Sequence, residues 1–308
     1  MARWVVFGGT GYIGSALCKQ LVAQGDTVIS VSRAKSGPDG CDHRTVDLAE
    51  VTDFDALLRP GDNVVYAGGL ASRKSCERSP ELAKRLNCEC PLAILRVAEA
   101  AAANSFTYLS SVKALTPPAG VIACETTGQP ATDAYGHSKW CAEQHILSTR
   151  GTCRVNVIRP AVVYGDAQSG VQASNSAGKI HSLLRLLGRS LTVLPSSGRR
   201  TVVHIDDLVA AILAVAGNSL CDRQVYIAAE PRFYDVGSIA SALSGRQIRT
   251  SRRLTRWLLS PLRPLASLPA ARRLLEVERC ELYSAARLRA ALHWRAHARY
   301  SDYLRGGV

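Results

Sequence analysis

The sequence predicts an α/β fold in which helices cover both faces of a parallel sheet. Two observations lead to this prediction. Short β-rich runs alternate with helical patterns from residue 4 to residue 228, and strands that alternate with helices pair in parallel. Glycines and serines follow the strand candidates at 4–7, 63–67 and 106–109, at the sheet edge where ligands bind. The sequence therefore predicts a doubly wound sheet of the Rossmann type.

Residues 3–14, RWVVFGGTGYIG, predict a strand, a tight turn and the start of a helix. Glycines let the backbone bend sharply and approach a diphosphate, whose charge is met by the N–H groups at the helix N-terminus. Gly8, Gly11 and Gly14 form GxxGxxG, a variant of the dinucleotide fingerprint. An ordinary strand-to-helix turn is the alternative interpretation.

The next β-rich run, 27–31, is followed by Ser32 and Arg33. In dinucleotide-binding folds the end of this strand meets the adenosine ribose, where Asp or Glu favours NAD and Arg accommodates the 2′-phosphate of NADP. No acid follows this strand directly, so the sequence favours NADP(H) over NAD. The alternative is that Arg33 is a solvated surface residue.

The other elements continue the alternation of strands and helices. From residue 44 onward the sequence predicts a strand at 44–46, a helix at 51–58, a strand at 63–67, a helix at 79–103, a strand at 106–109, a helix at 133–149, a strand at 154–158, a loop at 166–179, a helix at 180–187, a strand at 201–205, a helix from Asp206, its cap, to 217, and a strand at 225–228. Within 180–187 we expect Leu183, Leu184 and Leu187 to be buried.

Composition points to a globular cytoplasmic protein without a bound metal. The 308 residues are 47% hydrophobic and 20% charged, and no apolar run approaches the roughly 18 residues of a membrane span. The N-terminal apolar run is too short for a signal peptide. Ten cysteines occur at irregular spacings without a CxxC pair, which favours reduced thiols over zinc or disulfides.

The positive charge lies mostly in the last fifth of the chain. The formal net charge is +13, and residues 246–305 contain fourteen arginines against four acids, an excess of ten. Such an excess favours an anionic partner. Arg252, Arg253, Arg256 and Trp257 beside three leucines make a basic amphipathic segment that can lie on a membrane, or the leucines can pack on the core. The sequence shows no basic platform interleaved with aromatic residues, the pattern typical of nucleic-acid binding, so a nucleic-acid partner is not predicted.

Three residues suit the transfer of a proton to or from a carbinol oxygen. Ser111 follows a strand, and Tyr135 and Lys139 are four residues apart on the helix predicted at 133–149, so their side chains share one face. A tyrosine with a pKa of about 10 can donate a proton at neutral pH, and a lysine cation close by is expected to lower that pKa. Each residue alone also has an ordinary structural explanation.

Six segments together resemble the extended short-chain dehydrogenase/reductases of the nucleotide-sugar epimerase, dehydratase and reductase group. They are GGTGYIG (8–14), LSSVK (109–113), YGHSK (135–139), RPAVVYG (159–165), RRTVVHIDDL (199–208) and LHWR (292–295). The resemblance implies a dinucleotide-binding domain of residues 1–165 and 201–228. A smaller, mostly helical substrate domain would then contain residues 166–200 and 229–308.

The resemblance also implies roles for individual residues. Ser111, Tyr135 and Lys139 would be catalytic. With Arg33, the expected cofactor contacts are Gly8, Gly11, Tyr12, Ile13, Gly14, Asp47, Leu48, Ala67, Gly68, Asn87, Tyr135, Lys139 and Pro160. The expected substrate contacts are Lys113, Arg200, Arg272, Arg273 and Arg279.

Departures from the family pattern reduce the number of candidate reactions. The 4,6-dehydratases of this group have Asp-Glu after the catalytic Ser or Thr, whereas this chain has Val112-Lys113, so dehydration is not predicted. The leading hypothesis is NADP(H)-dependent reduction of a 4-keto nucleotide-linked deoxy sugar. The resemblance is to the reductases and epimerases that serve bacterial polysaccharide synthesis. The alternatives are an NAD-dependent 4-epimerase and a non-catalytic NADP-binding scaffold. Similar proteins often dimerise through the helices predicted at 79–103 and 133–149.

Overall fold

The chain folds around a seven-stranded parallel sheet, described by a computed structural model for residues 1–51, 53–165, 175–265, 267–268, 271 and 274–306. The strand order is β13-β9-β5-β4-β1-β2-β3. Its strands are β1 (Arg3–Phe7), β2 (Thr27–Ser32), β3 (Asp42–Thr45), β4 (Asn63–Tyr66), β5 (Ser105–Leu109), β9 (Arg154–Pro160) and β13 (Gln224–Ala228). The order runs outward in both directions from the β1–β4 pair, which confirms the predicted doubly wound Rossmann-type sheet.

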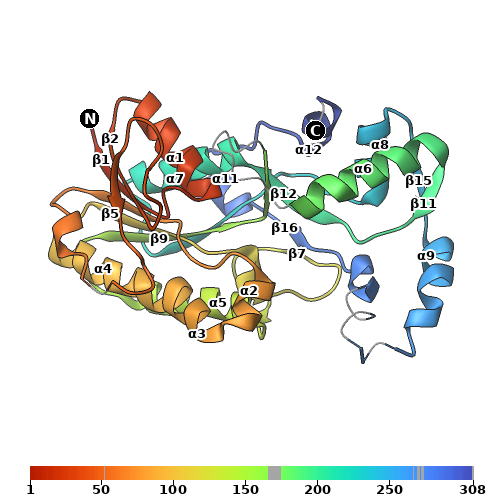
Figure 1. Ribbon diagram of the computed structural model, residues 1–308, viewed down its shortest axis with the longest axis horizontal. Coiled ribbons are helices and arrows are strands. Elements are labelled where there is room, and N and C mark those ends of the chain that lie inside the picture. Colours follow the sequence, from red (N-terminus) through yellow and green to blue (C-terminus); the bar gives the residue numbers. More distant parts are fainter. Residues whose placement is uncertain (52, 166–174, 266, 269–270, 272–273, 307–308) are drawn as a thin grey trace.

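Helices cover both faces of this sheet (Figure 1). Side chains alternate along a strand, so Trp4 and Val6 pack with α1 (Tyr12–Ala23), α7 (Ile205–Gly217) and α11 (Ala286–Leu292). Val5 and Phe7 instead pack with α4 (Cys90–Ala100) and α5 (Ala134–Ser148). The inner strands are therefore buried on both faces, as their continuous apolar runs predict, whereas the edge strand β3 is polar and mostly exposed.

The helix predicted at 79–103 is continuous from Pro80 to Ala100, but its winding changes, because α3 (Pro80–Lys84) passes through a π-helical turn (Arg85–Glu89) into α4. Pro91 has no N–H with which to bond the Asn87 carbonyl four residues earlier. The Tyr108 hydroxyl donates to that carbonyl at 2.6 Å. Likewise, the Tyr66 hydroxyl donates to the Leu86 carbonyl at 2.5 Å. Two tyrosines from neighbouring strands thus satisfy the backbone where the helix changes its winding.

The C-terminal half adds a third apolar core beside the sheet. It includes Tyr164, Leu184, Leu194, Leu243 and Tyr300, and it lies on the right in Figure 1. The elements around it are β10 (Val162–Tyr164), α6 (Asn175–Ser190), β11 (Val193–Pro195), β12 (Arg200–His204), β14 (Phe233–Tyr234), α8 (Val236–Ser244), β15 (Arg249–Ser251), α9 (Arg252–Leu259) and α12 (Tyr300–Arg305). Short pieces complete the description: α2 (Arg73–Arg78), β6 (Leu115–Thr116), β7 (Ile122–Ala123), β8 (Gln129–Pro130) and β16 (Leu282–Tyr283).

Several local predictions differ from the structure. Helix α6 begins at Asn175 rather than 180, and residues 166–174 of the predicted loop lie outside the described residues. Leu184 is buried, whereas Leu183 is 54% exposed. Among the described residues of the helix predicted at 51–58, Asp55–Leu57 form a 3-10 turn and the others are not helical. His204, not Asp206, caps α7, because its ring accepts the Asp206 N–H.

The ten cysteines are all free thiols, as their spacing predicts. Within the described part of the chain, no helix has the length and apolar character needed to span a membrane.

Candidate active site

The turn between β1 and α1 packs backbone directly against backbone. Gly8 has a φ of +82°, and a Cβ there would lie 2.6 Å from the Gly68 nitrogen. A Cβ on Gly14 would lie 2.1 Å from the Gly8 carbonyl oxygen. Gly11 is the N-cap of α1, whose first turn contains no acidic residue. The positive end of α1 therefore faces the cleft without a competing carboxylate, which suits the diphosphate of a dinucleotide.

The residues expected near adenosine follow β2 and β3. Arg33 is exposed directly after β2, while the buried Ser32 hydroxyl accepts a hydrogen bond from Thr10 of the glycine turn at 2.9 Å. Asp47 accepts the Ala49 N–H at 2.9 Å, and the Leu48 side chain lies beside Gly68. Arg33 is thus held close to the glycine turn, at the edge where a ribose would bind.

Asn87 is fully buried and positions the loop after β4 rather than lining the cleft. Its amide oxygen accepts the Leu70 N–H at 3.0 Å, and its amide nitrogen donates to the Leu70 carbonyl at 3.2 Å. The same nitrogen donates to Ser138 of α5 at 3.0 Å. Asn87 therefore fixes the loop that presents Ala67 and Gly68 to the helix that carries Tyr135.

Ser111, Tyr135 and Lys139 all line one cleft. Ser111 follows β5, and its hydroxyl accepts the Lys113 N–H at 3.2 Å. Asp133 caps α5 by accepting the Gly136 N–H at 3.1 Å, which starts the helix at Ala134 and brings Tyr135 and Lys139 to one face. The Lys139 ammonium donates to the Leu109 carbonyl at 2.9 Å.

A buried ion pair joins α5 to β9 beneath these residues. The Arg159 guanidinium contacts both carboxylate oxygens of Glu143, at 2.8 Å and 2.5 Å. Glu143 has no exposed surface, and it lies one helical turn beyond Lys139. This pair therefore holds α5 against β9.

Burial dominates the proton affinities of the two titratable candidates. It raises the pKa of the Tyr135 phenol above its ordinary value, and a hydrogen bond with Ser111 offsets part of the increase. It lowers the pKa of the Lys139 ammonium to about 8, against the charge of Glu143. For the protein alone the pKa of Tyr135 is thus raised rather than lowered as expected, because desolvation by burial is the largest contribution. Tyr135 is protonated at neutral pH and can donate.

The cleft has a volume of about 840 Å³ and crosses the carboxyl edge of the sheet from α1 to β12. It brings together residues predicted from far-apart segments: Gly11, Tyr12, Ile13, Ala67, Gly68, Ser111, Lys113, Tyr135, Lys139, Pro160, Arg200 and Arg279. Gly8, Gly14 and Asn87 support its walls, whereas Arg33, Asp47 and Leu48 lie beyond the lining. Arg272 and Arg273 lie outside the described residues.

Sequence reasoning missed Glu281, which joins two cationic side chains of the cleft. Its carboxylate pairs with the Lys113 ammonium and, at 3.2 Å, with the Arg200 guanidinium. Burial opposes ionisation, but the two cations outweigh it and hold the pKa of Glu281 below its ordinary value. Arg73 and Glu276, also missed, line the same cleft. No local motif marks Glu281, because its partner Lys113 is 168 residues away.

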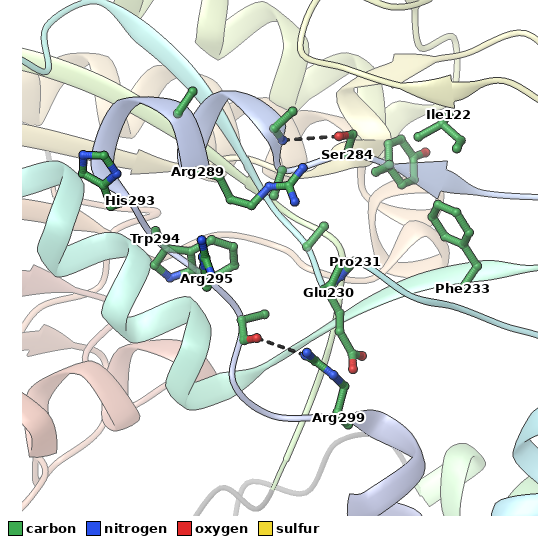
Figure 2. A pocket seen from close by; sticks show the side chains of 16 residues that line it. Ile122, Glu230, Pro231, Phe233, Ser284, Arg289, His293, Trp294, Arg295 and Arg299 are labelled. Atoms are coloured by element: carbon green, nitrogen blue, oxygen red, sulfur yellow. Dashed lines mark hydrogen bonds between the residues drawn. The ribbon is translucent and has the colours of Figure 1, made fainter.

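A second cavity of about 750 Å³ lies between α11 and the segment after β13 (Figure 2). Figure 2 shows Arg289, Arg299 and the buried Glu230 around it. Its lining includes none of the glycine-turn residues, Ser111, Tyr135 or Lys139. The cleft that contains those residues is therefore the candidate active site.

The sheet, the glycine turn and the Ser-Tyr-Lys set define an extended short-chain dehydrogenase/reductase. The model of the NAD-dependent epimerase/dehydratase family matches residues 4–228, and the chain belongs to that family. Members of this family use a nicotinamide cofactor, so the protein is an NAD(P)-dependent enzyme.

Among curated proteins, an uncharacterised chloroplast protein of Arabidopsis thaliana is 27% identical over 220 residues, which cover 68% of this chain and 70% of the relative. The fold is similar to that of UDP-glucose 4-epimerase from Thermotoga maritima with UDP-glucose, with a TM-score of 0.75, 19% identity and coverage of 98% of this chain and 96% of the other. It is also similar to UDP-glucose 4-epimerase from Thermus thermophilus with NAD, with a TM-score of 0.71, 20% identity and coverage of 99% and 100%.

Proposed function

We propose that the protein reduces the 4-keto group of a UDP-linked deoxy sugar with NADPH. The observation that carries this proposal is the single cleft that joins the glycine turn, the Ser111–Tyr135–Lys139 set and a cationic wall. That wall contains Arg73, Lys113, Arg200 and Arg279 against Glu276 and Glu281, four cations minus two acids, an excess of two. A nucleotide diphosphate supplies the matching negative charge.

The chain's own residues account for the proton side of the reaction. The protonated Tyr135 phenol donates to the carbonyl oxygen, and Ser111 hydrogen-bonds that oxygen as it gains charge. The Lys139 cation stabilises the phenolate that remains. A bound nicotinamide cofactor supplies the hydride. Val112, buried directly after Ser111, has no acid or base group with which to remove water, so dehydration is not part of the proposal.

The proposal also assigns substrate recognition to residues 166–200 and 229–308. It assigns binding of the dinucleotide to residues 1–165 and 201–228. Arg279 and Glu281 from the C-terminal segment face the cleft from that side. A panel of UDP-linked 4-keto deoxy sugars tests the proposal through the loss of NADPH absorbance. Absence of turnover with every member of the panel would contradict it.

A second candidate is a UDP-sugar 4-epimerase with tightly held NAD. It is supported by the two similar structures, both UDP-glucose 4-epimerases, one of them with NAD. The two candidates differ in the cofactor that copurifies. One equivalent of NAD released by denaturing the purified protein, together with interconversion of UDP-glucose and UDP-galactose, would replace the reductase proposal.

The choice of dinucleotide is expected to depend on Arg33. We expect Arg33→Ala to raise the KM for NADPH about tenfold or more and to leave the KM for NADH nearly unchanged, because a guanidinium hydrogen-bonds the 2′-phosphate that NADH lacks. Steady-state kinetics with both cofactors measure the ratio. The exposed Arg59→Ala, away from the cleft, is the control; equal effects of Arg33→Ala on both cofactors would contradict the role.

The pH dependence of reduction is expected to report Lys139. Since its pKa is about 8, the cation is present below that pH and is lost above it. We therefore expect kcat/KM, which reflects the free enzyme, to be level below pH 8 and to fall above it. In Lys139→Met the residual rate should show no break near pH 8, and an unchanged break there would assign the titration to another group.

A further inference from the structure

Helix α9 lies at the right of the molecule in Figure 1, at the opposite end from β1 and β2. Within its eight residues, all of them described, Thr255 alone is buried. The Thr255 hydroxyl donates to the Ser196 carbonyl at 3.0 Å, which ties one side of the helix to the end of β11. The alternative in which α9 packs its leucines on the core is only partly right, since Leu254 and Leu259 are half-buried but Leu258 is exposed.

The outer side of α9 combines arginines with a tryptophan. Arg253 and Trp257 are four residues apart and so lie one turn apart on one helix face, and Trp257 is 71% exposed. Arg252 and Arg256 follow the same spacing beside them, and both are exposed. We call these residues, together with Leu258, Arg263, Leu265 and Leu268, the α9 surface; every member is exposed.

The sequence around the α9 surface is free of negative charge. Residues 236–275 contain eight arginines and no Asp, Glu or Lys, giving an excess of eight positive charges. Single exposed leucines are ordinary on a protein surface. Here, however, leucines and a tryptophan recur among arginines in one continuous segment, which is the composition of helices that lie in a membrane interface.

Charge and apolarity together select the partner. A second copy of this chain would place like charges face to face, which disfavours association. A nucleic acid matches the charge but offers no apolar phase for Leu258, Leu265 and Leu268. An anionic bilayer matches both, because its phosphates pair with guanidinium groups while tryptophan and leucine enter the interface between headgroups and acyl chains.

We propose that the α9 surface docks the protein on an anionic phospholipid bilayer. The segment that follows α9 leads to Glu276 and Arg279, which line the cleft. The proposal does not depend on which reaction the cleft catalyses.

Vesicle flotation tests this proposal with the full-length protein. The wild type is expected to float with phosphatidylcholine vesicles that contain about one third phosphatidylglycerol, and not with pure phosphatidylcholine vesicles. Each basic residue near an anionic surface contributes about fivefold to partitioning, so the triple variant Arg252→Gln, Arg253→Gln, Arg256→Gln should partition about a hundredfold less. Trp257→Ala should also weaken binding while leaving the charge intact.

A charge-matched control separates this surface from net charge. The triple variant Arg59→Gln, Arg96→Gln, Arg150→Gln removes the same charge from exposed positions outside the α9 surface, and it should float like the wild type. Equal loss in the two triple variants would overturn the proposal, as would failure of the wild type to float at low salt. Retention of a random-sequence RNA by the wild type, lost only in the α9 variant and without flotation, would assign the surface to nucleic acid instead.

Discussion

Tyr135→Phe is expected to lower kcat for carbonyl reduction about a thousandfold, because proton transfer by a positioned side chain contributes roughly a hundredfold to ten-thousandfold. The phenol is the group that can donate: burial keeps it protonated, and Ser111 and Lys139 line the same cleft. Loss of one hydroxyl leaves the ring and the backbone of α5 in place. Single-turnover kinetics with NADPH and a UDP-linked 4-keto sugar measure the loss.

Two controls make the result specific to chemistry. Dinucleotide binding, followed by fluorescence, should persist in Tyr135→Phe because the glycine turn is unchanged. Tyr226→Phe removes a hydroxyl that contacts Cys221 in the core, outside the cleft, and should change kcat little. If Tyr135→Phe keeps a rate within tenfold of the wild type, another group donates the proton and the role proposed for Tyr135 is wrong.

The meeting of Ser111, Tyr135 and Lys139 in one cleft was predictable because its determinants are local. Tyr135 and Lys139 need only helical spacing and the cap at Asp133, and Ser111 needs only the end of a strand. The glycine turn is equally local, since a Cβ on Gly14 would collide with the Gly8 carbonyl within the same turn. Short-range geometry of this type is present in the sequence itself.

The cluster of Glu281, Lys113 and Arg200 was less predictable because it depends on contacts between distant segments. Glu281 reaches Lys113 and Arg200 because the chain after Glu278 returns beside β12, where the Thr201 N–H donates to the Glu281 carbonyl at 3.0 Å. No sequence pattern near Glu281 predicts that this segment lies beside β12. The π-helical turn between α3 and α4 was missed for a similar reason: Pro91 is visible in the sequence, but the hydroxyls of Tyr66 and Tyr108 that compensate for the altered winding come from other strands.

The position of α5 links stability to the proposed chemistry. Tyr135 and Lys139 depend on how α5 sits on the sheet, and the Glu143–Arg159 pair joins this helix to β9, the strand that ends at Pro160 in the cleft. Both partners are buried, at 0% and 5% exposure. A change at this pair should therefore affect both unfolding and the catalytic set above it.

Glu143→Gln is expected to destabilise the protein by about 3 to 5 kcal/mol, because it leaves the buried Arg159 charge without its counter-ion. The amide keeps the shape of the side chain, so the loss comes from charge rather than from a cavity. Urea unfolding followed by circular dichroism measures the change in the free energy of unfolding. We also expect reduced activity below the unfolding transition, since α5 loses its ionic link to the sheet.

A surface pair supplies the comparison. Asp42→Asn breaks the exposed contact with Arg44, made at 2.7 Å, and should cost less than about 1 kcal/mol because water screens it. The double variant Glu143→Leu, Arg159→Met removes both buried charges and should be more stable than Glu143→Gln alone, since no uncompensated ion remains. A cost for Glu143→Gln as small as that of Asp42→Asn would show that α5 is held by its apolar contacts with the sheet rather than by this pair.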